Sequence, residues 1–392
     1  MAVILIAFIG KRLYGIHNVK KAISDVNGGE TVSVVNDTVV RKIGLIQGVV
    51  DKYFLDEYTN EALEDGIYSG MINALNDKYA AYYSPEELKQ LKDDSEGIYY
   101  GIGAYITMNT EMGYPAIAGV MDDSPAKEAG LMTGDIIVMV DETATDGMES
   151  VDVVKLIKGE EGTFTHITVA RGENNEIFEF DVERRRVESP TVNQKMLDDN
   201  IGYIQVTEFD TVTADQFTEA LAVCKGSGAR GIIIDLRSNL GGNLDAVVDM
   251  CRHILPEGLI VYTCDKHGER EEYTSDGSHE LKLPLVVLTN GYSASASEIM
   301  TGAIKDYGIG TIVGTTTYGK GIVQKVVSLS DGSAVKLTVS KYYTPKGTCI
   351  HGTGIEPDIE VEFDADAYYD KQTDNQLDAA IKEIHRKWEE EN

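Results

Sequence analysis

Three serines stand at alternate positions in one segment of small residues: Ser293, Ser295 and Ser297. The segment follows the apolar run 285–289, which predicts a buried strand, and precedes a predicted helix over residues 297–307. A turn from a strand into a helix exposes a side chain, and the unpaired amides at the start of the helix can face a developing oxyanion. These serines are candidate nucleophiles, although a serine-rich helix cap has the same composition.

A nucleophilic serine needs a base, and the sequence offers two residue types for that role. The histidines are weak candidates, because they lie in polar turns or, for His253, late in a predicted helix. Lys320 stands between Gly319 and Gly321, which allow the backbone to approach another segment closely. Burial lowers the pKa of a lysine and makes it a base. A solvated lysine in a turn is the alternative interpretation.

A third segment could bind an oxyanion. Asp235-Leu-Arg237-Ser-Asn239-Leu-Gly241-Gly242 follows the apolar run 231–236, which predicts another buried strand. A Gly-Gly turn after such a strand presents backbone amides to a ligand. The same pattern also fits an ordinary turn between a strand and a helix.

Composition narrows the function classes. The 392 residues include 65 acidic and 35 basic ones, a net charge of −30, which argues against nucleic acid as a partner. The glycine-rich stretches match neither a P-loop nor a dinucleotide fingerprint. The four cysteines form no CxxC pair, so we expect no metal site and mostly free thiols, with a Cys251–Cys264 bridge left open.

The chain divides into five segments, and the expected fold class is a multidomain α/β (α+β) protein. Residues 1–37 start with a short apolar run and continue as a polar linker, which indicates the remnant of a membrane anchor; a buried strand or short helix is the alternative. Residues 38–95 have helical spacing. Residues 96–185 form a β-rich module, residues 186–362 alternate strands and helices as a layered α/β core, and residues 363–392 form a helical tail.

The tail carries an apolar stripe at helical spacing. We expect the stripe to dock on the body of the protein, with a homodimer through this C-terminal helix as the alternative. It consists of Leu377, Ile381, Ile384 and Trp388.

Five motifs, in this order along residues 38–362, resemble the C-terminal processing peptidases, the tail-specific serine proteases of family S41. Each motif alone is weak, but the ordered set is specific. They are Asp235-Leu-Arg-x-Asn-x-Gly-Gly242, Ser293-Ala-Ser-Ala-Ser-Glu298, Tyr318-Gly-Lys-Gly321 with Gln324, Lys341-Tyr-Tyr-Thr-Pro345-x-Gly347, and Gly354-Ile-Glu-Pro357-Asp358.

The resemblance implies a role for each matching residue. Ser295 matches the nucleophile, Lys320 the base, and Gln324 the residue that orients the lysine. The backbone amides of Gly241 and Ala296 match the oxyanion hole.

Asp306 matches a supporting position, with helix capping as the alternative. The chain departs from the family pattern at Leu240, Lys305 and Tyr318, none of which is in the proposed catalytic set.

The module over residues 96–185 resembles a PDZ domain. Tyr100, Gly101, Ile102 and Gly103 match the loop whose amides bind a C-terminal carboxylate. Asp123-Ser-Pro-Ala-Lys-Glu-Ala-Gly130-Leu-x-x-Gly134-Asp135 matches the helix–turn–strand signature that follows.

Together, these features predict a serine endopeptidase that needs no metal or organic cofactor and acts on proteins or peptides with free C-termini. The resemblance and the apolar start imply a bacterial membrane protein working on the extracytoplasmic side, or a secreted or periplasmic one. A catalytically dead PDZ scaffold and a hydrolase of non-peptide esters are the alternatives.

Overall fold

The computed structural model describes residues 4–5, 34–110 and 112–390. Most of the predicted anchor and linker lies outside them; of that segment, Ile4–Leu5 form β1, which pairs in parallel with β18 (Ile322–Ser328). No helix in the described ranges is long and apolar enough to span a bilayer.

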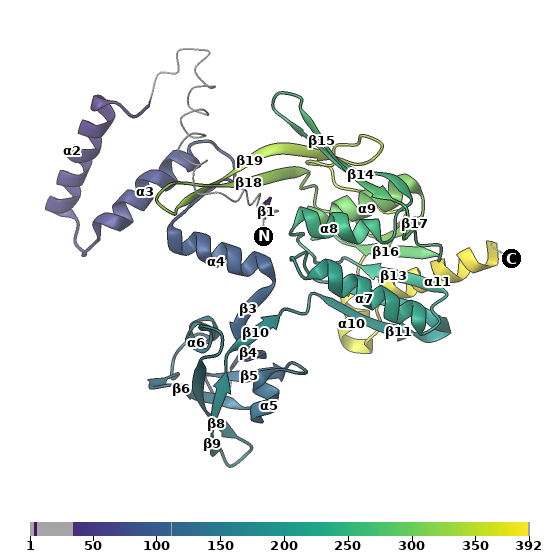
Figure 1. The fold of residues 1–392 in the computed structure, drawn as a ribbon, viewed down its shortest axis with the longest axis horizontal. Helices are drawn as coiled ribbons and strands as arrows, with labels where there is room; N and C mark the ends of the chain where they lie inside the picture. Colours follow the sequence, from purple (N-terminus) through teal and green to yellow (C-terminus); the bar gives the residue numbers. More distant parts are fainter. Residues whose placement is uncertain (1–3, 6–33, 111, 391–392) are drawn as a thin grey trace.

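The N-terminal part lies at the left of Figure 1 and consists of helices with one short strand. The strand pairs with β19 (Ala334–Tyr343), more than 200 residues later, and the helix pattern gave no sign of it. The elements are α2 (Asp37–Tyr53), α3 (Asn60–Asn73), β2 (Ala81–Tyr83) and α4 (Pro85–Glu96).

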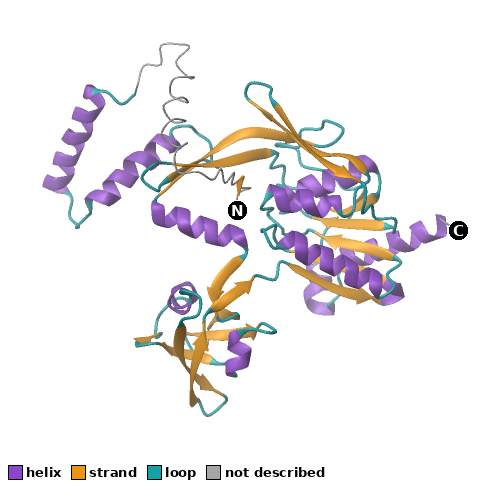
Figure 2. Ribbon diagram, in the orientation of Figure 1, coloured by secondary structure: helices purple, strands orange, loops and turns teal. Residues whose placement is uncertain are grey.

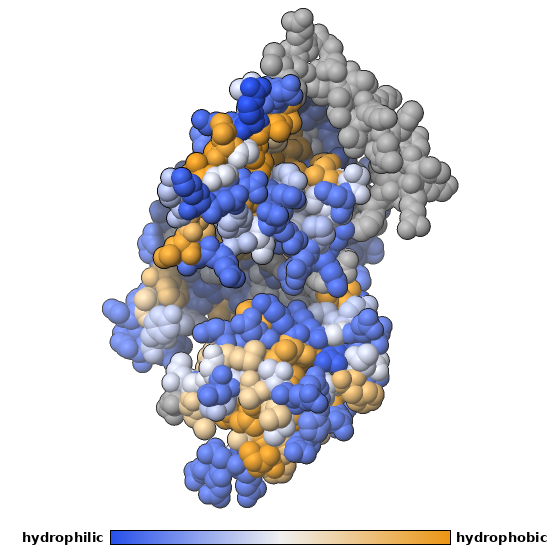
Figure 3. Space-filling view, turned by 90° about the vertical axis from the view of Figure 1, so that its left-hand side faces the viewer, coloured by the Kyte–Doolittle hydropathy of each residue, from blue (hydrophilic) through white to orange (hydrophobic). Residues whose placement is uncertain are grey.

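Helix α4 starts as its sequence predicts. Ser84 Oγ accepts from the Glu87 amide at 3.3 Å, Glu87 Oε2 accepts from the Ser84 amide at 2.8 Å, and Pro85 occupies the first helical position. By contrast, α2 and α3 bury none of their side chains completely. Apolar and hydrophilic residues are interspersed on the side of the molecule that carries these helices (Figure 3).

The β-rich module, at the bottom of Figure 1, has its own hydrophobic core and a sheet in the order β4-β5-β6-β8-β9, with β7 on β6. A two-stranded ribbon of β3 (Ile98–Gly101) and β10 (Arg185–Glu188) joins it to the rest of the chain. The other elements are β4 (Ala104–Asn109), β5 (Tyr114–Val120), α5 (Pro125–Ala129), β6 (Ile136–Val140), β7 (Thr143–Ala144), α6 (Ser150–Ile157), β8 (Phe164–Arg171) and β9 (Glu176–Glu183).

The core is built on a sheet in the order β11-β12-β13-β16-β17-β20, parallel except for β11. Helices cover both faces (Figure 2), which explains why β13 and β16 are apolar throughout. The strands are β11 (Val192–Leu197), β12 (Ile201–Val206), β13 (Gly231–Asp235), β16 (Leu285–Thr289), β17 (Gly310–Gly314) and β20 (Ile359–Glu360).

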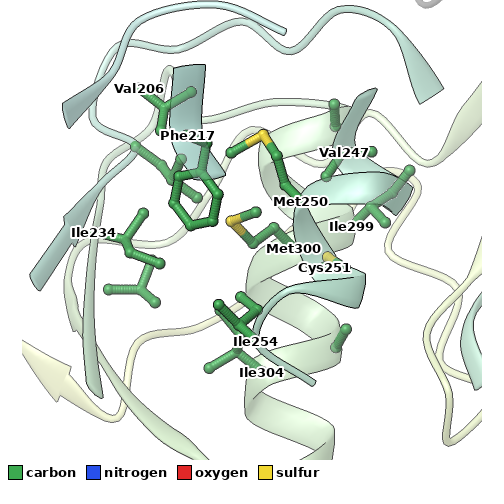
Figure 4. Packing of buried hydrophobic residues seen from close by; sticks show 14 of the residues in the cluster. Val206, Phe217, Ile234, Val247, Met250, Cys251, Ile254, Ile299, Met300 and Ile304 are labelled. Carbon is green, nitrogen blue, oxygen red and sulfur yellow. The ribbon is translucent and has the colours of Figure 1, made fainter. Parts of the chain in front are cut away.

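One face of this sheet packs against three helices: α7 (Thr213–Gly226), α8 (Leu244–Arg252) and α9 (Ala296–Tyr307). Phe217, Met250 and Met300 meet in this layer, one from each helix (Figure 4). Because α9 is buried along most of its length, its N-terminus is held firmly at the carboxyl end of β16.

The opposite face packs against α11 (Asn375–Glu390), which follows the short helix α10 (Ala365–Lys371). Ile384 is buried, and Trp388 Nε1 donates to the Arg230 carbonyl at 2.9 Å. The apolar stripe of the tail thus docks on the body of the protein, and nothing supports the homodimer through it.

A second sheet was not predicted as such. The long hairpin of β18 and β19 extends from the core toward α3 (Figure 1), and β19 also pairs with β14 (Glu257–Asp265), which pairs with β15 (Arg270–Asp276). The fold class predicted from the sequence, multidomain α/β, is confirmed. All four cysteines are free, so the Cys251–Cys264 bridge does not form.

Candidate active site

Ser295 lies at the junction of β16 and α9, where it is the N-cap residue of the helix. Its backbone has φ 57° and ψ −113°, a sparsely populated conformation for a residue with a side chain. The side chain is fully buried, yet Oγ has no hydrogen-bond partner among the described residues. A buried hydroxyl without a partner is rare in proteins, and its place on a strained turn makes Ser295 the strongest candidate nucleophile of the three serines.

The two neighbouring serines differ from Ser295 in this respect. Ser293 Oγ accepts from the Asn290 amide at 3.0 Å and donates to the Leu236 carbonyl at 2.8 Å. Ser297 Oγ donates to the Asn239 carbonyl at 2.9 Å. Ser293 and Ser297 therefore hold the turn against the loop that follows β13, and only Ser295 keeps its hydroxyl available.

Lys320 lies between β17 and β18 and is only 6% exposed. Burial, followed by the positive charges of Lys336 and Lys78, lowers the pKa of Lys320 to about 8, against the opposing effect of the Glu298 carboxylate. Its Nζ lies over the ring of Tyr79, 4.7 Å from the centroid. A substantial fraction of Lys320 is therefore neutral at mildly alkaline pH and able to accept a proton.

The Glu298 carboxylate connects the serine and lysine segments and is fully buried. Oε2 accepts from the amides of Ser295 and Lys320, at 2.9 and 2.8 Å. Oε1 accepts from Thr317 Oγ1 at 2.6 Å and from the Gly319 amide at 2.7 Å. Four hydrogen bonds satisfy this charge without water, and they place the two segments side by side.

Gln324 is fully buried at the start of β18. Its Nε2 donates to the Tyr79 carbonyl at 2.5 Å, while Oε1 lacks a partner within the described part of the chain. Tyr79, in the turn between α3 and β2, therefore contacts both Gln324 and Lys320. Sequence reasoning missed Tyr79 because it treated residues 38–95 only as a helical region.

The two predicted oxyanion donors lie beside the serine. A Cβ placed on Gly241, whose φ is +100°, would lie 2.7 Å from Ser295 Cβ and 2.9 Å from the Ala296 nitrogen. Ala296 provides the first amide of α9, which helix geometry leaves without an acceptor. The Gly241 amide, however, donates to Asn239 Oδ1 at 2.8 Å, so it must turn away from Asn239 before it can bind an oxyanion.

Comparison with known proteins decides the family. The model of peptidase family S41 matches residues 200–361, and a PDZ domain model matches residues 117–171. Carboxy-terminal processing protease CtpB of Bacillus subtilis is 32% identical over 330 residues, which cover 83% of this chain and 68% of that protein. The chain belongs to peptidase family S41.

Two further relatives are similar to this S41 chain. A probable CtpA-like serine protease of Staphylococcus epidermidis is 33% identical over 82% of the chain, and the match spans 65% of the relative's length. The solved structure of a photosystem II D1 C-terminal processing protease is 31% identical, with a TM-score of 0.48 and coverage of 80% of this chain and 86% of that one.

None of the histidines in the described ranges, nor Lys320, is hydrogen-bonded to Ser295 Oγ. His253 and His279 stack on each other with ring centroids 4.9 Å apart.

Asp306 supports the surroundings of the site and does not enter it. It lies near the C-terminal end of α9, where Oδ2 accepts from the Lys346 amide at 2.7 Å. This bond ties the C-terminal end of α9, the helix that begins at Ser295, to the turn after β19. The C-cap residue of α9 is Gly308, so Asp306 does not cap this helix.

The predicted tail-binding residues span the end of β3 and the turn into β4. Tyr100 is exposed, whereas Gly101, Ile102 and Gly103 are buried, and Gly101 pairs with Arg185 of β10. Among the described strands, β4 pairs only with β5, and α6 packs beside it. The turn therefore leads into an edge strand to which an extended peptide could add, and the role of the four residues stays a prediction.

A cavity of about 880 Å³ opens next to the segment that carries Lys320, lined among others by Tyr79, Tyr318, Gly319 and Ile322. Neither Ser295 nor Lys320 lines it, and Ser295 is fully buried. In this structure Ser295 Oγ is therefore not exposed to this cavity.

Proposed function

We propose that this chain is a serine endopeptidase that cleaves protein substrates through an acyl-enzyme, with Ser295 as nucleophile and Lys320 as base. The observation that supports it best is the pairing of a buried, unpaired serine hydroxyl with a buried lysine of lowered pKa, held together by Glu298. Family membership supports the same reaction class.

In the proposed mechanism, neutral Lys320 Nζ accepts the proton of Ser295 Oγ while Oγ bonds to the carbonyl carbon of the substrate. The amides of Gly241 and Ala296 stabilise the oxyanion. The C–N bond then breaks, and the leaving amine takes the proton from Lys320. A water molecule then gives a proton to neutral Lys320 and attacks the ester carbon. The C–Oγ bond breaks, Oγ takes the proton back from Lys320, and the new C-terminus is released with Ser295 and Lys320 restored.

Two contacts in this structure must change before this reaction can start. Lys320 Nζ has to leave the ring of Tyr79 for Ser295 Oγ, and the Gly241 amide has to leave Asn239. Gln324 supports the first step, because Oε1 is unsatisfied near the lysine segment and can accept from the ammonium as it forms.

We further propose that the PDZ module selects substrates by their C-termini. An edge strand preceded by a glycine-containing turn suits an extended tail whose carboxylate is bound by backbone amides. The expected extracytoplasmic location rests on the apolar run at the N-terminus and on the resemblance, and it stays a prediction.

The test uses one unstructured protein substrate with an apolar tail, prepared with a free C-terminal carboxylate and as the C-terminal amide. Wild type should cleave the free acid faster, and Ser295→Ala should cleave neither. Undiminished cleavage by Ser295→Ala would sink the serine mechanism. Equal cleavage of acid and amide by wild type would leave the protease assignment standing and remove carboxylate recognition.

A further inference from the structure

A tyrosine hydroxyl lies between the nucleophile and base segments without touching substrate. Tyr342, on β19, is 1% exposed. Its hydroxyl oxygen lies 2.9 Å from the carbonyl oxygen of Ser295 and 2.7 Å from that of Lys320. A phenol has one proton to donate, so the two carbonyls share it. Burial raises the pKa of Tyr342 well above its usual range, which favours the protonated hydroxyl.

The hydroxyl complements the carboxylate of Glu298. Glu298 Oε2 accepts from the amides of Ser295 and Lys320, and Tyr342 donates to the carbonyls of the same two residues. The amides of Ser295 and Lys320 are therefore joined through Glu298, and their carbonyls are joined through Tyr342. Two side chains from different elements fix the separation of two backbones.

The carbonyl contact matters most at Ser295, because ψ sets the direction of a residue's carbonyl. The ψ of −113° at Ser295 belongs to a strained conformation, and strain of this kind persists only where surrounding contacts over-determine it. The bond from Tyr342 holds that carbonyl and thereby opposes relaxation of the turn. If the turn relaxes, Oγ moves relative to Lys320.

We propose that Tyr342 is a positioning residue of the protease, which holds the backbones of Ser295 and Lys320 in register for proton transfer. This inference rests on the proposed function. Rates are sensitive to such register, since a displacement of about 1 Å between reacting groups can lower a rate by about 10²-fold.

The experiment compares Tyr342→Phe with a matched control, Tyr307→Phe. Tyr307 lies on α9, and its hydroxyl donates at 2.9 Å to the carbonyl of Leu259, outside the catalytic centre. Both variants lose a tyrosine hydroxyl bonded to backbone, so both should lose a few degrees of melting temperature. Tyr342→Phe should lower kcat by about 10- to 100-fold at unchanged KM, whereas Tyr307→Phe should keep the wild-type kcat.

Two further readouts separate positioning from general damage. The rate at which a fluorophosphonate labels Ser295 should fall in Tyr342→Phe in parallel with kcat, and the pH midpoint of activity should stay in place, because no charge near Lys320 changes. A kcat within twofold of that of Tyr307→Phe overturns the role of Tyr342. A rise in KM that accounts for the whole loss also overturns it.

Ser295→Ala in the same assay tests the proposed function separately from the positioning role of Tyr342. If Ser295→Ala is inactive and Tyr342→Phe matches its control, only the positioning role fails. If Ser295→Ala cleaves at the wild-type rate, the proposed function fails, and the role of Tyr342 fails with it.

Discussion

Replacing Ser295, the proposed nucleophile, with alanine should stabilise this protein, whereas replacing the nearby Ser293 should destabilise it. Ser293 and Ser295 are both fully buried, but the hydroxyl of Ser293 makes two hydrogen bonds and that of Ser295 makes none in the described ranges. The pair therefore forms a controlled comparison of a satisfied and an unsatisfied buried hydroxyl in one turn.

The magnitudes follow from the contacts. A buried polar group without a partner costs about 1–3 kcal/mol, so Ser295→Ala should raise the free energy of unfolding by about that amount. Ser293→Ala leaves the Leu236 carbonyl and the Asn290 amide without this partner and should lower it by about 1–3 kcal/mol. Ser295→Gly should also relieve about 1–3 kcal/mol of backbone strain. The greater flexibility of the unfolded chain with glycine offsets roughly 0.5–1 kcal/mol of this gain in the free energy of unfolding.

The assay is urea unfolding of wild type and the three variants, followed by the tryptophan fluorescence of Trp388, which reports on the core because its indole bonds to Arg230. If the variants share the same dependence of the free energy of unfolding on urea, the urea midpoints rank their stability. The midpoint of Ser295→Ala should be higher than that of wild type, and the midpoint of Ser293→Ala should be lower. If Ser295→Ala loses as much stability as Ser293→Ala, the hydroxyl of Ser295 has a partner, and the interpretation of this turn as strained and unengaged is wrong.

Two further predictions concern activity. The rate should rise with pH through about 8, the pKa of Lys320; Lys78→Gln removes a cation that disfavours the ammonium, so this pKa should rise and the profile should move to higher pH. His351→Gln should leave the pH midpoint of kcat unchanged. If the midpoint moves in His351→Gln but not in Lys78→Gln, Lys320 is not the base. Gly241→Ala should abolish cleavage and also lower the free energy of unfolding, because φ is +100° and the new Cβ would lie 2.7 Å from both the Ala294 carbonyl oxygen and Ser295 Cβ. Peptide turnover and urea unfolding measure the two effects, and wild-type turnover at wild-type stability would contradict the close approach.

The residues brought together at the centre were largely predictable because each belongs to a contiguous motif. Ser295 and Gly241 both follow neighbouring parallel strands, β16 and β13, whose carboxyl ends meet at one edge of a sheet. Lys320 follows β17, the next strand in the same order. Local sequence therefore encodes both the turn and, through the sheet, its neighbours.

Contacts between distant segments were not predictable in the same way. Tyr79 has no distinguishing spacing, and its role appears only when β2 pairs with β19 and brings its carbonyl to Gln324. The hydrogen bond from the Gly241 amide to Asn239 Oδ1 depends on the rotamer of the Asn239 side chain, which the sequence pattern does not predict. The sequence alone did not exclude a homodimer through the C-terminal helix, because an apolar stripe does not indicate which surface covers it.

The contact between Tyr79 and Gln324 spans 245 residues of the chain. A ribosome delivers the N-terminal segment first, then the whole PDZ module, and only much later the strand that carries Gln324. Until β19 emerges, β2 has no strand to pair with, and the bridge of Tyr342 does not exist. An incomplete nascent chain therefore lacks these contacts of the proposed catalytic centre, so we expect cleavage activity to appear only once β19 has been synthesised.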